Sequence, residues 1–96
     1  MRFEWDAAKA AHNRQKHGVS FETATLVFAD PHALTDQDRI EGREYRWQTI
    51  GLVNGVVLLL VAHTDREVDG EEVVRIISAR RADKSERDRY EQARET

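Results

Sequence analysis

The chain has 96 residues, of which 40% are hydrophobic and 34% are charged, and its formal net charge is −3. These values predict one folded domain and exclude a disordered chain. The sequence contains no cysteine, which excludes disulfide bonds and thiolate metal sites. Its longest apolar run, residues 56–62, is too short to cross a bilayer, and the first residues lack the pattern of a signal peptide. We therefore expect a cytoplasmic protein.

The first third of the chain predicts one short strand followed by two helices. Residues 3–5 have the composition of a short strand. Asp6 is typical of a helix N-cap and Gly18 of a left-handed C-cap, so a first helix is expected between them. A second helix is predicted over residues 21–28. Pro31 ends it, because proline disfavours helical geometry in the residue before it.

Four further strands are predicted in the middle of the chain, over residues 33–36, 45–53, 56–62 and 73–79. Asn54 and Gly55 give the strongest hairpin signal, because both residue types tolerate a positive φ. Residues 36–44 are predicted to form a polar loop, and an acidic loop is predicted around Asp69 and Gly70. The nearly continuous apolar run in the third of these strands is typical of a central strand covered on both faces.

Asp83 and Glu86 have the spacing of a capping box, which predicts a terminal helix running towards Arg94. The resulting order, βααββββα, predicts the α+β class. We expect an antiparallel sheet of three to four central strands, packed by helices on one side.

The charges are distributed unevenly along the second half of the chain. Residues 64–74 contain five acidic residues and one base, Arg66, whereas residues 75–89 contain six bases and three acids. This asymmetry predicts a basic C-terminal face that can meet a polyanion although the whole chain is acidic. A solvated, charged helix explains the same pattern equally simply.

Candidate catalytic residues follow the two central strands and continue on the terminal helix, so we expect arginine, carboxylate, tyrosine and histidine side chains to gather beside one edge of the sheet. Cleavage of RNA without a metal ion needs groups that hold the scissile phosphate and stabilise its developing charge. Arg66 and Arg80 suit these tasks, because the planar guanidinium binds phosphate in two places and stays charged. Glu86, Tyr90 and His63 are side chains of the types that transfer protons.

Each candidate also has an ordinary structural explanation. Arg66 can pair with the acidic residues around it, and the capping box accounts for Glu86. Tyr90 is typical of a packing residue, and a lone histidine after an apolar strand, such as His63, is usually structural. The basic pair at residues 80–81 can equally bind an acidic protein partner. The other histidines show no metal-ligand spacing, so neither a metal site nor a cofactor site is predicted.

The sequence resembles the BrnT family along nearly its whole length. The motifs that carry the resemblance are Phe3-Glu4-Trp5-Asp6, Lys16-His17-Gly18-Val19-Ser20-Phe21, Val27-Phe28-Ala29-Asp30-Pro31, Glu44-Tyr45-Arg46-Trp47, Thr64-Asp65-Arg66 and Ile76-Ile77-Ser78-Ala79-Arg80, with Glu86 and Tyr90 after them. Each motif alone is weakly specific, but their order and spacing are specific together.

The resemblance implies a toxin of a type II toxin–antitoxin system with a RelE-like fold. Such a toxin is expected to be an endoribonuclease that cleaves RNA and arrests growth. The expected inhibitor is a BrnA-like ribbon-helix-helix antitoxin in a 2:2 complex, which binds operator DNA through the antitoxin. The alternative is a non-catalytic binding module that acts as a corepressor with a DNA-binding antitoxin.

The resemblance also ranks the candidate site residues. Arg66 and Arg80, in matching motifs, are the leading candidates to bind phosphate. Glu86 and Tyr90 are expected to transfer protons or to orient the arginines. Three further residues near them in the sequence are expected to contact RNA: Arg81, Lys84 and His63.

Overall fold

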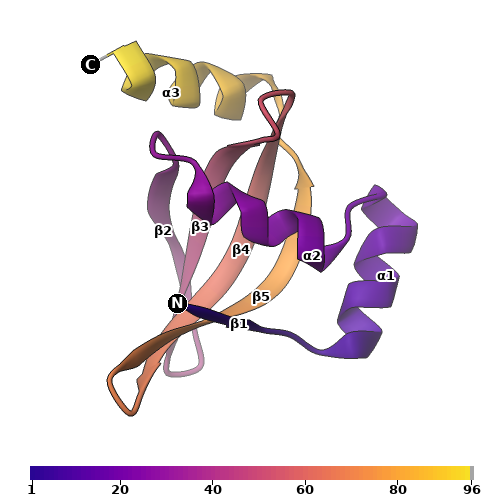
Figure 1. The fold of residues 1–96 in the computed structure, drawn as a ribbon, viewed down its shortest axis with the longest axis vertical. Coiled ribbons are helices and arrows are strands. Elements are labelled where there is room, and N and C mark those ends of the chain that lie inside the picture. The colour runs from indigo at the N-terminus through magenta and orange to yellow at the C-terminus, as the bar shows by residue number, and fades with distance from the viewer. Residues whose placement is uncertain (96) are drawn as a thin grey trace.

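A five-stranded mixed sheet forms the centre of the structure, a computed structural model that describes residues 1–95 (Figure 1). In chain order the elements are β1 (Arg2–Glu4), α1 (Ala7–His17), α2 (Phe21–Ala24), the 3-10 helix η1 (Thr25–Ala29), β2 (Leu34–Glu41), β3 (Glu44–Val53), β4 (Val57–Val68), β5 (Glu71–Arg81) and α3 (Lys84–Glu95). The strand order is β1-β5-β4-β3-β2. Within residues 1–95, none of the helices is both long and apolar enough to traverse a bilayer.

The α+β class is confirmed, and the predicted antiparallel arrangement of central strands holds for β2 to β5. The sheet differs from the prediction in having a fifth strand, which makes it mixed. β1 joins the edge of the sheet and runs parallel to β5, with Phe3 opposite Val74. The other neighbouring strands are antiparallel. A strand of three residues carries too little pattern to indicate its partner, which is why the sequence could not predict this pairing.

Two segments that were predicted as loops are strands of long hairpins. β2 continues to Glu41 and turns through Gly42, so the predicted loop over residues 36–44 is wrong. β4 and β5 likewise extend to a two-residue turn at Asp69 and Gly70, both with positive φ. These strand ends are rich in exposed charged residues, so they lack the apolar alternation from which strands are predicted. The turn at Asn54 and Gly55 is confirmed, again with both φ angles positive.

The helix α1 has the predicted ends. The Asp6 carboxylate accepts a hydrogen bond from the backbone N–H of Lys9 at 3.0 Å. Gly18 adopts a left-handed conformation, and its N–H donates to the carbonyl of Arg14. The predicted second helix is only a single α-helical turn, which continues as η1. At the junction the Thr25 hydroxyl donates to the carbonyl of Glu22 at 2.7 Å.

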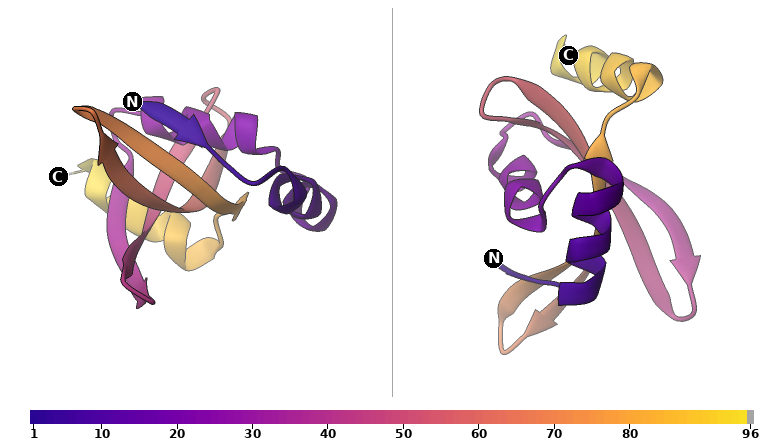
Figure 2. Two further views of the ribbon diagram at one scale, coloured as in Figure 1. Left: turned by 90° about the horizontal axis from the view of Figure 1, so that it is seen from below. Right: turned by 90° about the vertical axis from the view of Figure 1, so that its right-hand side faces the viewer.

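The helices cover both faces of the sheet, so the prediction of helices on one side is wrong (Figure 2). Leu59 and Val61 of β4 pack with α2 and η1, whereas Leu60 between them packs against α3. We name the face of the sheet that is covered by α2 and η1 the N-terminal face, and the face that is covered by α3 the C-terminal face. α3 covers only one end of the C-terminal face through Tyr90, and most of its own residues are charged.

Asn13 holds α1 against the edge of β5. Its side-chain amide donates to the carbonyls of Val19 and Ala79 at 3.0 and 2.9 Å, and its oxygen accepts the N–H of Ala79 at 3.1 Å. β1 pairs with β5 only as far as Arg75. Asn13 therefore satisfies backbone groups of β5 where β1 no longer reaches.

Asp30 joins segments from both sides of the sheet. Its carboxylate accepts the Tyr90 hydroxyl at 2.6 Å, the Leu52 N–H at 2.8 Å and the His32 N–H at 2.9 Å. Burial acts to raise the pKa of Asp30, but these hydrogen bonds outweigh it and hold the pKa below its ordinary value. Burial and the bond to Asp30 raise the pKa of Tyr90 to about 12.

Gly51 allows η1 to approach β3 closely. A Cβ atom at this position would lie 2.7 Å from both Cβ and the carbonyl oxygen of Val27. We expect Gly51→Ala to lower the free energy of unfolding by about 3 kcal/mol, because backbone must move to admit the methyl group. Gly18→Ala is the matched control: it meets only the left-handed φ with open space around it, and should cost about 1 kcal/mol. Urea unfolding measures both, and equal losses would contradict this account.

The bond between Tyr90 and Asp30 makes stability depend on pH. Because the pKa of Asp30 is lowered by folding, its interactions stabilise the protein above the unfolded value near 3.9, and this stability is lost as the pH falls through the folded value. Tyr90→Phe should therefore cost about 2 kcal/mol at pH 7 and only about 1 kcal/mol at pH 2. Tyr45→Phe is the control, because residues 1–95 show no hydrogen bond from its hydroxyl. A cost for Tyr90→Phe that does not change with pH would refute the role of Asp30.

Candidate functional site

The predicted site residues lie in two groups on the sheet, not in one. Arg80 is opposite Leu60 in the register of β4 and β5, whereas Arg66 is opposite Val73, six residues further along β4. At about 3.3 Å per residue the two backbones are roughly 20 Å apart. Arg80 lies with the residues of α3 at one end, and Arg66 lies near His63 towards the other end.

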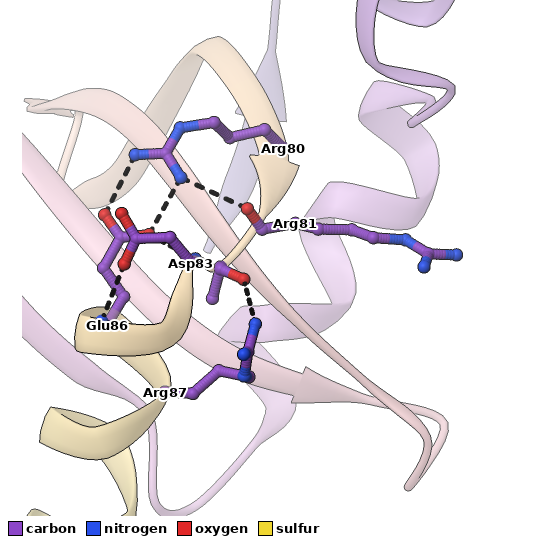
Figure 3. A network of polar contacts seen from close by, with 6 residues as sticks. Arg80, Arg81, Asp83, Glu86 and Arg87 are labelled. Atoms are coloured by element: carbon purple, nitrogen blue, oxygen red, sulfur yellow. Dashed lines mark hydrogen bonds and ion pairs between the residues drawn. The ribbon is translucent and has the colours of Figure 1, made fainter.

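At the first end, Arg80 and Glu86 form a bidentate ion pair (Figure 3). Nη1 of Arg80 donates to one carboxylate oxygen at 2.8 Å, and Nη2 donates to the other at 2.9 Å. Nη1 also donates to the carbonyl of Arg81 at 3.2 Å. The Arg80 side chain is 39% exposed and that of Glu86 only 11%. The carboxylate thus holds a guanidinium whose outer edge faces solvent.

Glu86 is fixed by the predicted capping box as well as by Arg80. The Asp83 carboxylate accepts the N–H of Glu86 at 2.9 Å, and Glu86 accepts the N–H of Asp83 at 2.8 Å. The hydrogen bond from Arg80 is the main cause that lowers the pKa of Glu86 below its usual value. The same bond raises the pKa of Arg80. Glu86 is therefore ionised at neutral pH. In this form its carboxylate accepts hydrogen bonds and has no proton to donate.

The remaining predicted residues at this end lie apart from the ion pair. Arg81 points away from Arg80, as Figure 3 shows, and lines a separate hollow of about 590 Å³ with residues of α1. Lys84 is exposed and pairs with Asp88 at 3.0 Å. Tyr90 is 1% exposed and bound to Asp30. This geometry gives Tyr90 a structural role, since proton transfer to RNA would require it to leave Asp30.

At the other end the sheet divides into two hairpins. The last register pair that joins β3 to β4 within the described residues is Trp47 and His63. Beyond it, β3 continues beside β2 and β4 continues beside β5, and the hairpin ends separate (Figure 2, right). A cleft of about 470 Å³ lies where they part, which we name the fork cleft. It is lined by Arg43, Glu44, Tyr45, Trp47, Thr64, Asp65 and Arg66.

Arg66 stands at the fork cleft and is held by Glu4 of β1. Nη2 of Arg66 donates to one oxygen of Glu4 at 3.0 Å, and Nη1 donates to the other. This hydrogen-bonded pairing lowers the pKa of Glu4 and raises that of Arg66. The Arg66 side chain is 51% exposed. The arginine is thus oriented by a carboxylate, as Arg80 is at the opposite end.

His63 lies beneath the fork cleft and is 1% exposed. Its Nδ1 lies 2.7 Å from the Asp65 carboxylate and its Nε2 lies 2.8 Å from the Thr49 hydroxyl, which in turn bonds to Thr35. Phe28 meets the imidazole edge to face at 4.9 Å between ring centroids. A buried ring with both nitrogens bonded cannot touch RNA directly, but it fixes the position of Asp65.

The sequence analysis missed the aromatic side chains of the fork cleft. Tyr45 and Trp47 stack with 6.5 Å between ring centroids and 29° between planes, and Tyr45 is 55% exposed. Their separation by two residues in a predicted strand places them on one face, which is the signal that could have found them. This signal was not used because residues 36–44 were predicted as a loop. A strand that pairs with residues 44–47 to form a second hairpin was therefore not expected.

The described part of the chain has no cluster of side chains suited to bind a metal ion. Residues 1–95 contain no group of three or more histidine, cysteine, aspartate or glutamate side chains that could hold a metal ion. The groups at both ends of the sheet are instead arginine–carboxylate pairs. Such pairs can bind and orient an anion through the N–H groups that the carboxylate leaves unoccupied.

Comparisons with known proteins identify the family of the chain. The family model described as "Ribonuclease toxin, BrnT, of type II toxin-antitoxin system" matches residues 5–86. A crystal structure of the Brucella abortus ribonuclease toxin BrnT superimposes with a TM-score of 0.67 and 26% sequence identity, over 88% of this chain and 99% of that one. Comparison with curated protein sequences gave no significant match. The family match covers most of the chain, including both arginine–carboxylate pairs except for Glu4, and the chain therefore belongs to the BrnT family of ribonuclease toxins of type II toxin–antitoxin systems.

Proposed function

We propose that this chain is an endoribonuclease that cleaves RNA without a metal ion, and that Arg80 and Arg66 bind phosphates of the substrate. The observation that carries the proposal is the Arg80–Glu86 pair, in which a buried carboxylate fixes an outward guanidinium. Hydrogen bonds within residues 1–95 occupy Nη1 twice and Nη2 once. Since guanidinium has five N–H donors, two stay available for phosphate oxygens.

Both arginines face the same side of the sheet. Arg80 is opposite Leu60, which packs on the C-terminal face, and the alternation along β4 puts Arg66 on that face too. The β-bulge between β4 and β5 falls at Ala62 and His63, and the extra residue belongs to β5. The alternation of side chains along β4 is therefore unbroken. An extended RNA strand of several nucleotides along β4 can therefore meet both guanidinium groups.

The reaction needs charge stabilisation at the scissile phosphate. The ribose 2′-oxygen attacks phosphorus, the bond to the 5′-oxygen breaks, and the products are a 2′,3′-cyclic phosphate and a 5′-hydroxyl. Arg80 stabilises the negative charge that grows on the equatorial oxygens, in an orientation set before substrate binds. Glu86 positions Arg80, and the protons of the two hydroxyl groups exchange with solvent. Tyr90 contributes indirectly, by fixing α3 through Asp30.

The partner that we propose is a BrnA-like ribbon-helix-helix antitoxin, in a 2:2 complex that binds operator DNA through the antitoxin. The family description supports an antitoxin, because a type II toxin is neutralised by a protein. A RelE-like fold and a cytoplasmic site of action belong to the same proposal. The two charged ends of the sheet are candidate surfaces for such a partner.

Removal of either arginine should abolish toxicity. We expect Arg80→Ala and Arg66→Ala each to lower the rate of RNA cleavage by about 100-fold, since each removes a preorganised donor. Induced expression should then no longer arrest growth. Arg39→Ala is the matched control, because Arg39 is an exposed arginine on β2 that pairs with Glu41. Cleavage should continue in EDTA, and circular dichroism checks that each variant is folded.

Two results would overturn the proposal in different ways. Full cleavage by folded Arg80→Ala and Arg66→Ala variants would remove the site assignment. A wild-type protein that neither cleaves RNA nor arrests growth, but strengthens operator binding by the antitoxin, would establish the corepressor alternative instead.

A conservative change separates positioning from binding at Glu86. Glu86→Gln keeps the side-chain shape and an oxygen acceptor but loses the charge that fixes Arg80. We expect cleavage to fall by about tenfold, with the substrate KM nearly unchanged and the loss confined to kcat. A pH–rate profile should lack any step that belongs to Glu86, because its lowered pKa keeps it ionised over the working range. A wild-type step that disappears in Glu86→Gln would show that Glu86 transfers a proton.

A further inference from the structure

We propose that the fork cleft binds one unpaired base of the RNA substrate. The base enters between the hairpin ends and stacks on Tyr45, while Arg66, which lines the same cleft from the C-terminal face, holds the adjoining phosphate. This inference rests on the proposed function and specifies its substrate as single-stranded RNA. It assigns a binding role to Tyr45 and Trp47, which lie outside the arginine–carboxylate pairs.

The first support is an aromatic platform with an uncovered side. The Tyr45 ring lies against Trp47, with planes 29° apart, and remains 55% exposed. A nucleobase laid on the exposed side continues the stack. Proteins that bind single-stranded nucleic acid use aromatic side chains in this way, and the base must be unpaired to reach them.

The second support is the size and origin of the cleft. It exists because β3 and β4 part after Trp47 and His63, so the two hairpins form separate walls. Its volume of about 470 Å³ is within the range of small-ligand sites. A nucleotide fits such a space, whereas the paired bases of a duplex are stacked inside the helix and cannot enter it.

The third support is the balance of charge in the cleft. Arg43 and Arg66 line it together with Glu44 and Asp65, so its walls are close to neutral. This composition disfavours a phosphate channel and suits a base, because carboxylate oxygens accept the amino protons of base edges. In this arrangement Arg66 is the residue that binds phosphate. Its hydrogen bonds to Glu4 use two of the five N–H donors of the guanidinium, which leaves three for phosphate oxygens.

The floor of the cleft is rigidly organised. Asp65 is bonded to His63, which is buried and bonded to Thr49. The Thr49 hydroxyl is within 2.8 Å of that of Thr35, so the chain of hydrogen bonds crosses β4, β3 and β2. A carboxylate oriented before the ligand arrives loses little freedom on binding, which favours a specific site.

Binding should be measured with an RNA that cannot be cleaved. The probe is a fluorescent single-stranded hexanucleotide of mixed sequence with 2′-O-methyl groups, which remove the attacking hydroxyl. We expect Tyr45→Ala to raise its Kd about tenfold by fluorescence anisotropy, because one stacked base is lost. Tyr45→Phe keeps the ring and should stay within about twofold of wild type. Val56→Ala, in the exposed turn at the opposite end of the sheet, is the control and should bind as wild type does.

Salt dependence distinguishes the base from the phosphate. Tyr45→Ala should leave the slope of log Kd against log salt concentration unchanged, since no phosphate contact is lost. Arg66→Ala should reduce that slope by about 0.7, the value for one phosphate of a single strand. A duplex of the same sequence should bind wild type and Tyr45→Ala equally.

The outcomes separate this inference from the proposed function. Wild-type binding by Tyr45→Ala, together with normal cleavage of unmodified RNA, would overturn the cleft and leave the nuclease intact. Binding that depends on Tyr45 in a protein that cleaves nothing would keep the cleft and overturn the nuclease. Loss of antitoxin binding in Tyr45→Ala, with RNA binding unchanged, would identify the cleft as a protein interface and overturn the inference.

Discussion

The carboxylate of Asp30 connects three parts of the chain: the segment after η1, the sheet and α3. It accepts hydrogen bonds from Leu52 in the sheet, from the chain just after η1, and from Tyr90 on α3. Tyr90 is the residue of α3 that belongs to a core cluster, and Ala82, just before the helix, packs in the same cluster. The position of α3, and with it the Arg80–Glu86 pair, therefore depends on one half-buried acid that lies sixty residues before Tyr90. Residues distant from Arg80 thus determine where the proposed phosphate-binding group lies.

The pairing of arginines with carboxylates explains how an acidic chain can present the RNA-binding surface that we propose. The pairs on the C-terminal face are Arg46 with Glu41, Arg66 with Glu4, Arg80 with Glu86, and Arg89 with Asp36. Exposed pairs of this kind stabilise a protein little. Their effect is to orient guanidinium groups, so the acids belong to the proposed binding surface even though they lower its net charge.

Local signals predicted local structure, and the rest depended on contacts that no short segment encodes. Asp6, Gly18, Asn54 and the capping box at Glu86 each act through their own neighbours, so the ends of α1 and the central hairpin were predictable. The parallel pairing of β1, the second face covered by α3 and the length of the hairpins arise from distant contacts. For the site, the sequence singled out both leading arginines, but it predicted a single cluster where the structure separates them. The spacing of Tyr45 and Trp47 could be read from the sequence, but the cleft beside them exists only because two hairpins diverge in the fold.

The amide of Asn13 has a consequence for association as well as for folding. By pairing with both the N–H and the C=O of Ala79, it occupies the backbone groups that an added strand would use. β2, on the opposite edge of the sheet, is charged, exposed and interrupted by a bulge after Gln37. Strand addition at an open edge is the usual route by which sheets aggregate. Asn13 blocks it where β1 leaves β5 uncovered, and the charges and bulge of β2 disfavour it at the opposite edge. A single side chain that imitates a peptide group thus guards against aggregation as well as fixing α1.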